Sequence, residues 1–336
     1  MEELKKFYSG KKVLVTGGAG CIGSCLVEKL DEFGAQISIL DNMMRGQEAV
    51  RNLEGVLNST STPPKIFIKD ITDVFQVKNI FKKENGFDIV FHLAALPSHR
   101  LALEDPRAYI ETDVMGTTNI LEVARLSKTP TVVFASSNKV YGKQTPPFRE
   151  DKPCLPEGPY ALAKFQSEQI CQMYSTYWGL NTPVVRFHHV LGPRTQPDRE
   201  ISIFTEQIIK GETPKVHGVY EGEIFISCAA DYTDVNDAVE GALRAGMIKG
   251  FDTFNLATGK VTTVEDIAKK IMVKLGKDIP IEYKKMLSHE TLVHLSDISK
   301  AEKILGWTPK RTVDESVRDY VDWRLKFGKR PDAFYK

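Results

Sequence analysis

The sequence predicts an α/β fold with a doubly wound parallel sheet and a smaller, mainly C-terminal part. Short β-branched runs alternate with amphipathic helical stretches through the first half of the chain. This alternation is typical of βαβ units, whose crossovers are nearly always right-handed. The 336 residues are 42% hydrophobic and 26% charged, as expected for a globular protein with one large or two smaller domains.

The strands and helices of the first half follow from their patterns. Six runs read as buried strands: residues 12–17, 36–41, 65–70, 88–94, 131–136 and 183–190. Helical periodicity covers residues 22–33, 73–85, 106–127 and 160–178. Five prolines in residues 143–159 predict an irregular loop.

The pattern changes in the second half. We expect a helix near 201–210, a strand at 252–259 that returns to the main sheet, a helix at 263–275, a strand near 280–284 and a helical region at 297–327. The predicted division is a nucleotide-binding domain over 1–185, completed by the strand near 252–257. A substrate-binding part would comprise 186–251 and 258–336.

Charge and cysteine usage exclude several classes of function. The net charge is +1, so no basic surface for nucleic acid or an anionic membrane is predicted. No apolar segment approaches the ~20 residues that span a bilayer, and the N-terminus does not resemble a signal peptide. Five cysteines without a CxxC pair indicate no disulfide framework and a reducing cytoplasm.

The most informative stretch is the glycine-rich loop in "VLVTGGAGCIGSCLVEKL". Gly17, Gly20 and Gly23 follow the first strand and precede a helix. Glycine lets the backbone approach a pyrophosphate, and the helix N-terminus offers free N–H groups to the anion. Asp41 ends the second strand, where a carboxylate can bind the adenine ribose and repel a 2′-phosphate. The sequence therefore predicts a Rossmann fold that binds NAD, although Arg45 nearby leaves NADP open.

A second feature is the pair Tyr160 and Lys164 in "GPYALAKFQSEQ". Residues four apart share one face of a helix. Tyrosine alone is a poor base at neutral pH, but a nearby positive charge favours the phenolate. The pair is a candidate proton acceptor, although this spacing also occurs by chance.

With these residues in place, the chain resembles the extended short-chain dehydrogenase/reductase family. It looks most like the NAD-dependent sugar-nucleotide epimerases and dehydratases, in particular the UDP-glucose 4-epimerase group. The segments that carry the resemblance are "TGGAGCIG", "DNMMRG", "KDITD", "FHLAA", "GTTNILEVAR", "SSNKVYG", "YALAK" and "DISKAEKILGWTPK".

The resemblance implies roles for individual residues. Tyr160 would be the acid/base, Lys164 would favour its phenolate and bind the nicotinamide ribose, and Ser137 would orient the substrate hydroxyl. The expected cofactor contacts are Gly17, Gly20, Cys21, Ile22, Gly23, Asp41, Asn42, Arg45, Gly46, Asp70, Ile71, Leu93, Ala94, Ala95, Tyr160 and Lys164. The expected substrate contacts are Ser137, Asn138, Lys139, His189 and Arg194.

The chain also departs from the family pattern. Asn138 and Lys139 stand where 4,6-dehydratases carry Asp-Glu, and an amide cannot act as a carboxylic acid. A related Asn-Lys pair occurs in 2-epimerases of CDP-sugars, so the epimerised carbon stays open. Asp113 replaces a frequent Asn, which alters the support behind the site.

Other departures concern histidines and arginines. His189 stands where Asn is common, and His188 is expected in the core. Adjacent residues of a strand point in opposite directions, so these two do not predict a metal site. Two arginines that hold the diphosphate in relatives are missing, at Ala230 and near Leu292. Arg194, Arg199 or Lys215 could compensate.

The leading hypothesis is NAD-dependent epimerisation of a nucleotide-diphosphate sugar at C4, on a UDP-hexose or its uronic or acetamido derivative. The alternatives are a CDP-sugar 2-epimerase, a 4,6-dehydratase, a dehydrogenase of a substrate without a nucleotide, and a non-catalytic NAD-binding sensor. The apolar helices at 106–127 and 160–178 resemble the family's dimer contact, so a homodimer is expected.

Overall fold

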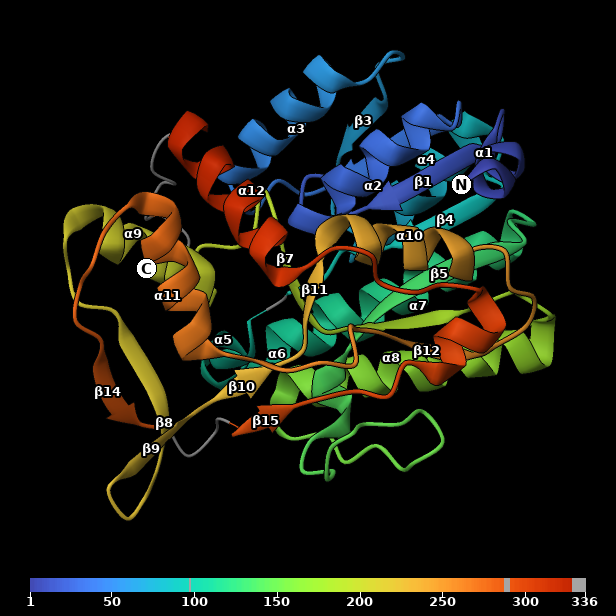
Figure 1. Cartoon of the computed structure of the whole chain (residues 1–336). Coiled ribbons are helices and arrows are strands. Elements are labelled where there is room, and N and C mark those ends of the chain that lie inside the picture. Colours follow the sequence, from blue (N-terminus) through green and yellow to red (C-terminus); the bar gives the residue numbers. More distant parts are fainter. Residues whose placement is uncertain (97, 287–290, 328–336) are drawn as a thin grey trace.

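The computed structural model describes residues 1–96, 98–286 and 291–327. Its centre is a seven-stranded parallel sheet in the order β12-β6-β5-β4-β1-β2-β3 (Figure 1). The order reverses on either side of β1 and β4, so the predicted doubly wound sheet is confirmed. Its strands are β1 (Lys12–Thr16), β2 (Gln36–Asp41), β3 (Lys65–Ile68), β4 (Ile89–His92), β5 (Thr131–Ser137), β6 (Val184–Phe187) and β12 (Thr253–Leu256).

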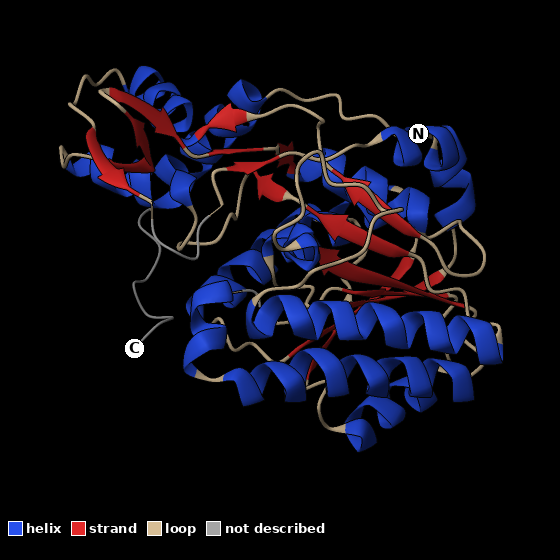
Figure 2. Ribbon diagram, turned by 90° about the horizontal axis from the view of Figure 1, so that it is seen from below, coloured by secondary structure: helices blue, strands red, loops and turns tan. Residues whose placement is uncertain are grey.

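Helices cover both faces of this sheet (Figure 2). One apolar cluster lies under α1 (Glu2–Tyr8), α2 (Cys21–Glu32), α3 (Gln47–Ser59) and α10 (Val235–Ala245). A second lies under α4 (Val74–Glu84), α7 (Gly116–Leu126) and α8 (Gly158–Trp178). Burial on both faces explains why the strands read as continuous apolar runs.

The smaller part has its own core. It contains α9 (Glu200–Lys210), α11 (Val264–Leu275) and α12 (Val313–Phe327), packed against small sheets. The short strands are β7 (His189–Leu191), β8 (Lys215–Glu221), β9 (Ile224–Ser227), β10 (Ala229–Ala230), β11 (Tyr232–Asp234), β13 (Thr262–Thr263), β14 (Glu282–Lys285) and β15 (Val293–His294). They pair as β13-β10-β15, β11-β7 and β14-β8-β9.

One predicted strand, at 183–190, is wrong as a single element. The chain leaves the main sheet after Phe187, and His189 pairs with Tyr232 in a separate two-stranded sheet. The switch occurs because β7 finds its partner in β11, which belongs to a distant stretch of sequence. This change of sheet turns the segment from the seven-stranded sheet toward the smaller part.

The helical predictions also differ in detail. Helices α1 and α3 were not predicted. The expected helix at 106–127 is built from α6 (Pro106–Tyr109), a π-helical turn η1 (Ile110–Met115) and α7, after a short α5 (His99–Glu104). The region at 297–327 divides into a π turn, η3 (Ala301–Leu305), and α12. A 3₁₀ turn, η2 (Asn138–Tyr141), follows β5.

Candidate active site

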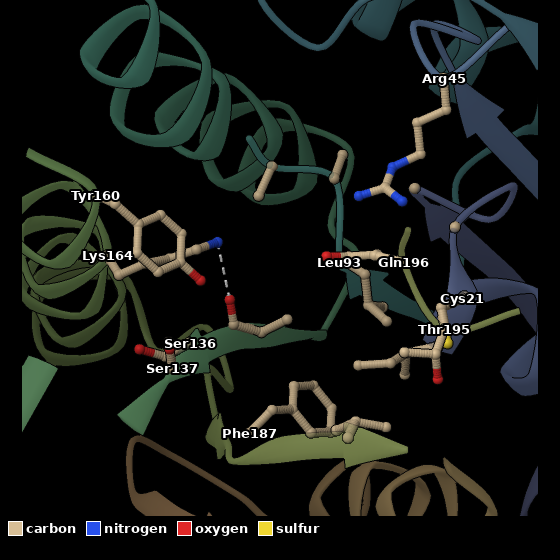
Figure 3. A pocket seen from close by; sticks show the side chains of 18 of the residues that line it. Cys21, Arg45, Leu93, Ser136, Ser137, Tyr160, Lys164, Phe187, Thr195 and Gln196 are labelled. Atoms are coloured by element: carbon tan, nitrogen blue, oxygen red, sulfur yellow. Dashed lines mark hydrogen bonds between the residues drawn. The ribbon is translucent and has the colours of Figure 1, made fainter. Parts of the chain in front are cut away.

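A pocket opens at the carboxyl ends of the central strands, where ligands bind in open α/β sheets. Its lining includes Gly17 after β1, Leu93 after β4, Ser137 at the end of β5 and Phe187 at the end of β6. Figure 3 shows two ends of this pocket. Tyr160, Lys164 and Ser137 gather at one end, and Cys21 and Arg45 lie at the other.

The glycine loop forms a cradle that leaves no room for a side chain at Gly17 or Gly23. Gly17 has φ +71°, and a Cβ there would lie 2.8 Å from the backbone N of Ala94. A Cβ on Gly23 would lie 2.2 Å from the Gly17 carbonyl oxygen. Helix α2 begins at Cys21, and its N-cap residue Gly20 provides no side-chain cap. This arrangement fits the pyrophosphate of a dinucleotide, because it presents backbone N–H groups and the positive end of the helix dipole.

Asp41 lies at the end of β2 beside this cradle. Its Oδ2 accepts from the Ala19 N–H at 3.0 Å and its Oδ1 from the Met43 N–H at 2.9 Å. Burial raises the pKa of this carboxyl, and the two N–H groups and Arg45 oppose the rise. The carboxylate therefore orders the loop and stands at the pocket wall, where a ribose would lie.

Most of the expected cofactor residues line the pocket, and two do not. Gly20, Cys21, Ile22, Asn42, Ile71, Ala94 and Ala95 are in the lining with those already named. Gly46 instead is the N-cap residue of α3. Asp70 accepts from the side chain of Asn42 at 2.8 Å and from Thr72. Gly46 therefore serves as a helix cap, and the Asp70 carboxylate orders the turn after β3 and the Asn42 side chain rather than lining the pocket.

The predicted proton-transfer pair lies at the start of α8. Tyr160 and Lys164 are buried, with 9% and 4% of their surfaces exposed, yet both line the pocket. Lys164 Nζ donates to the carbonyl oxygen of Ala135 at 3.1 Å, the dashed line in Figure 3. The Tyr160 ring packs edge-on against Tyr109, with centroids 6.2 Å apart. These contacts fix both side chains from behind and leave their polar ends toward the pocket.

Ser137 ends β5 on the same side. Its Oγ accepts from the Lys139 N–H at 3.2 Å and donates to Asn138 Oδ1 at 3.4 Å. The neighbouring Ser136 donates to Glu168 at 2.5 Å, and Glu168 pairs with Arg186. The buried pair holds Ser136, so Ser137 is the serine suited to a substrate hydroxyl.

One wall of the pocket carries Lys139 and His189, and His294 packs against both of them from outside the lining. Lys139 Nζ lies 3.3 Å from His294 Nε2, and the rings of His189 and His294 are 5.2 Å apart. His189 Nδ1 lies 3.6 Å from Glu200, which also accepts from the Tyr232 hydroxyl at 3.2 Å. Burial and the nearby Lys139 lower the pKa of His294 strongly, so its imidazole is neutral.

Three polar atoms near this wall are buried and have no hydrogen-bond partner among the described residues: Asn138 Nδ2, His189 Nε2 and His294 Nδ1. Buried polar groups are normally satisfied, so unpartnered ones at a pocket indicate a ligand position. His188 is buried as predicted and bonds to Ser296 Oγ at 2.8 Å, but it also lines the pocket.

Arg194, a predicted substrate contact, does not reach the pocket. Its guanidinium forms a bidentate pair with Glu28 on α2, with the shorter distance at 2.6 Å, and it lies outside the pocket lining. At the positions of the missing arginines, Ala230 pairs with His294 across β10 and β15. The Leu292 carbonyl accepts from the Ala229 N–H.

Sequence reasoning missed several lining residues. These are Leu40, Met44, Lys69, Thr112, Ala135, Ser136, Phe187, Val190, Leu191, Thr195, Gln196, Glu200 and Tyr232, while Arg199 was considered only as a phosphate ligand. The segment from Thr195 to Glu200 leads into α9, and the start of that helix lines the pocket. Its only sequence signal was the loop "GPRTQPDRE" after the last strand of the first half.

The described ranges contain neither a membrane-spanning helix nor a metal-binding cluster. No described helix is long and apolar enough to cross a bilayer. No group of three or more described His, Cys, Asp or Glu side chains is arranged to hold a metal ion.

Comparison with known proteins agrees with this geometry. The sequence profile described as GDP-mannose 4,6 dehydratase matches residues 14–320. A UDP-glucuronate 4-epimerase of Thermodesulfobacterium geofontis is 31% identical over 315 residues, covering 92% of this chain and 95% of that protein. A UDP-glucose 4-epimerase of Mycolicibacterium smegmatis is 32% identical over 323 residues, covering 93% and 98%.

Solved structures give the same result. The UDP-glucose 4-epimerase of Thermotoga maritima, solved with UDP-glucose, superposes with a TM-score of 0.83 at 31% identity, covering 94% of this chain and 99% of that one. The Thermus thermophilus UDP-glucose 4-epimerase, in complex with NAD, has a TM-score of 0.82 at 27% identity, with 94% and 100% covered. The predicted resemblance is confirmed: the chain belongs to the extended short-chain dehydrogenase/reductase family, in the group matched by the GDP-mannose 4,6 dehydratase profile.

Proposed function

We propose that this protein is an NAD-dependent sugar-nucleotide epimerase that inverts C4 of a UDP-sugar. One observation carries the proposal: Tyr160, Lys164 and Ser137 line the same pocket as the glycine cradle. Relatives of similar length are named UDP-sugar 4-epimerases, and one of their structures contains NAD. Asp41 favours NAD over NADP, because a carboxylate beside the ribose repels a 2′-phosphate.

The chain's own residues supply the proton chemistry. Gly17, Gly20, Gly23 and Asp41 would hold NAD⁺, which would supply the hydride acceptor for the sugar carbon and the donor for the return of that hydride. Tyr160 as phenolate accepts the proton of the sugar hydroxyl, and Ser137 Oγ hydrogen-bonds that hydroxyl and orients it. The Lys164 ammonium stabilises the phenolate. The C4 ketone would rotate in the pocket, so that its opposite face receives the hydride. Tyr160 then returns the proton to the C4 oxygen, and the product has the opposite configuration at C4.

The carboxylates of the pocket favour epimerisation over dehydration. Loss of water beside a ketone needs a carboxylic acid or similar group near Ser137, and Asn138 stands there. The acidic side chains in the lining are Asp41, at the cradle, and Glu200, which is engaged by His189 and Tyr232. Neither carboxylate contacts Ser137, whose hydrogen bonds among the described residues go to Asn138 and Lys139. Tyr160 is then the lining group suited to exchange a proton with the sugar hydroxyl, as epimerisation requires.

Among UDP-sugars, we propose UDP-glucuronate as the first substrate to test. Lys139 follows Ser137 by two residues and lines the pocket, and its ammonium is held beside the neutral His294. A cation near the reacting sugar favours an acidic sugar, because a carboxylate forms charge-assisted hydrogen bonds with it. Asn138 Nδ2 is a second donor on this side.

The experiment is incubation of the purified protein, without added NAD, with UDP-glucuronate, UDP-glucose and UDP-N-acetylglucosamine, and with CDP-, GDP- and dTDP-sugars. Chromatography with mass detection follows the products. A new peak of unchanged mass is expected with at least one UDP-sugar. Loss of water would identify a dehydratase, and no change with any sugar nucleotide would refute the proposal.

A Tyr160→Phe variant separates an enzyme from an NAD-binding sensor. Losing the phenol removes the proton acceptor, so turnover should fall by about 10² to 10⁴-fold while NAD binding stays close to that of the wild type. Calorimetric NAD titration alongside the product assay measures both. A wild-type protein that binds NAD and transforms no sugar nucleotide would be a sensor.

We also propose a homodimer. Tyr177 and Trp178 at the end of α8 expose 75% and 49% of their surfaces, and Leu162 on the same helix exposes 42%. Large apolar side chains exposed along one helix are typical of a protein interface. Light scattering should give twice the monomer mass of 37.7 kDa, and a monomer would contradict the prediction.

A further inference from the structure

A buried carboxylate lies behind the catalytic lysine. Asp113 Oδ2 is 3.8 Å from Lys164 Nζ, and the Asp113 side chain is fully buried. Lys164 lines the pocket and Asp113 does not, so the carboxylate touches the lysine from outside the pocket. At 3.8 Å the contact is an ion pair rather than a direct hydrogen bond. The hydrogen bond of the ammonium goes instead to the Ala135 carbonyl.

The backbone around Asp113 is locked in place. Asp113 belongs to the π-helical turn η1, a rare geometry that is frequent at functional sites. Its carbonyl accepts from Thr117 Oγ1 at 2.5 Å and from Ser167 Oγ at 2.8 Å. Ser167 lies one turn after Lys164 on α8, so the π turn and the catalytic helix are joined at this point.

The two oxygens of the Asp113 carboxylate face different neighbours, the Leu96 N–H and Lys164. Oδ1 accepts from the Leu96 N–H at 2.9 Å, in the segment that continues from the lining residue Ala95. Oδ2 has no hydrogen-bond partner among the described residues. A buried carboxylate oxygen without such a partner is costly unless a charge compensates it, and Lys164 is that charge.

The other titratable groups around Lys164 are neutral or already paired. Burial and Lys164 lower the pKa of His92 to about 3, and its ring is held by Thr16 and Thr117. Burial raises the pKa of the Cys171 thiol.

Two further groups sit near α8. Glu168 is paired with Arg186 at 2.6 Å, and the Tyr109 hydroxyl donates to the Ser98 carbonyl. Burial raises the pKa of Asp113, while Lys164 and the Leu96 N–H oppose the rise. Of the described acidic side chains, Asp113 is the one paired with Lys164.

We propose that Asp113 is a positioning residue that holds Lys164 from behind and partly offsets its positive charge, so that it sets the pH at which Tyr160 becomes the proton acceptor. The proposal rests on the proposed function, in which Lys164 stabilises the Tyr160 phenolate. An ionised Asp113 weakens that stabilisation and shifts the working range of the enzyme toward higher pH. Loss of the carboxylate should therefore make the phenolate form at lower pH.

The test is Asp113→Asn, which keeps the shape and an acceptor for the Leu96 N–H but removes the charge. The matched control is Glu111→Gln, because Glu111 lies on the same π turn, is 52% exposed and pairs with Arg107 at the surface. In Asp113→Asn, the pH at which kcat reaches half of its plateau on the acidic side should fall by roughly one pH unit. In the control it should not move.

A second readout does not need turnover. Tyrosinate ultraviolet absorbance is titrated with pH, and the matching Tyr160→Phe protein is subtracted to isolate Tyr160. Its half-point should shift down with Asp113→Asn even if no sugar nucleotide is transformed, which separates this inference from the proposed function. Should Asp113→Asn fail to fold, Asp113→Ser removes the same charge with a smaller side chain. Titrations that superpose on the wild type, with a folded variant, would overturn the proposal.

Discussion

Gly23→Ala tests the cofactor cradle most directly. The added Cβ would lie 2.2 Å from the Gly17 carbonyl oxygen and 2.9 Å from two neighbouring backbone carbons. Unstrained contacts lie near 3.5 Å, so the loop must move by about 1 Å. Forced backbone shifts of this kind cost about 1–3 kcal/mol, and they displace the N–H groups that face a pyrophosphate.

We expect Gly23→Ala to weaken NAD binding at least tenfold, since about 1.4 kcal/mol of lost contact corresponds to a factor of ten. Isothermal titration calorimetry measures the affinity, and thermal unfolding with and without NAD measures the stabilisation that the cofactor provides. Gly20→Ala is the matched control. Its Cβ would meet one atom, the Gly17 carbonyl oxygen, at 3.1 Å, and its φ of −76° suits any residue, so a much smaller loss is expected. Wild-type affinity in Gly23→Ala would refute the assignment of this loop.

Three further predictions concern stability and specificity. Glu168→Gln should lower the free energy of unfolding by about 3 kcal/mol, because Arg186 would stay buried without its charged partner; urea unfolding measures this, and a change below about 1 kcal/mol would contradict it. The free energy of unfolding should decline as pH falls from about 6.5 toward 3. Burial lowers the pKa of His92 and His188 to about 3, so in this range the unfolded chain binds protons on these histidines and the folded chain does not. Melting temperatures measured across this range check the prediction, and a constant melting temperature would count against it. Lys139→Gln should raise the KM for UDP-glucuronate about tenfold more than the KM for UDP-glucose. Steady-state assays that show equal increases for both substrates would mean that Lys139 does not recognise the sugar carboxylate.

Most of the residues predicted to bind the cofactor line the pocket, and there is a physical reason why the sequence could bring them out. A pyrophosphate is bound by backbone N–H groups, and the backbone geometry required depends on glycines at fixed spacing after a strand. Gly17, Gly20 and Gly23 and the strand-ending Asp41 are therefore visible without tertiary information. Tyr160 and Lys164 are visible for the same kind of reason, since a helix fixes their relation within one turn.

Long-range partners could not be predicted in this way. Arg194 looked available for phosphate, but its carboxylate partner Glu28 lies 166 residues away in the sequence and meets it only in the fold. His189 was placed in a strand of the main sheet, whereas its pairing with Tyr232 brings it to the pocket wall. Helix α3 was missed although Ala49, Leu53 and Val56 follow helical spacing, because no strong signal marked its ends.

The pocket wall that carries Lys139 and His189 is built differently from the end that carries Tyr160 and Lys164. Lys139, His189 and His294 come from η2, β7 and β15, and each is held by a partner from another element. Tyr160 and Lys164 share one helix. Lys164 is held by β5 and the π turn, and Tyr160 packs against Tyr109 of α6. A change on the wall can therefore alter which sugar binds without moving the proton-transfer pair. For that reason we expect substitutions at Lys139 to act mainly on KM, and substitutions at Asp113 to act on the pH dependence of kcat.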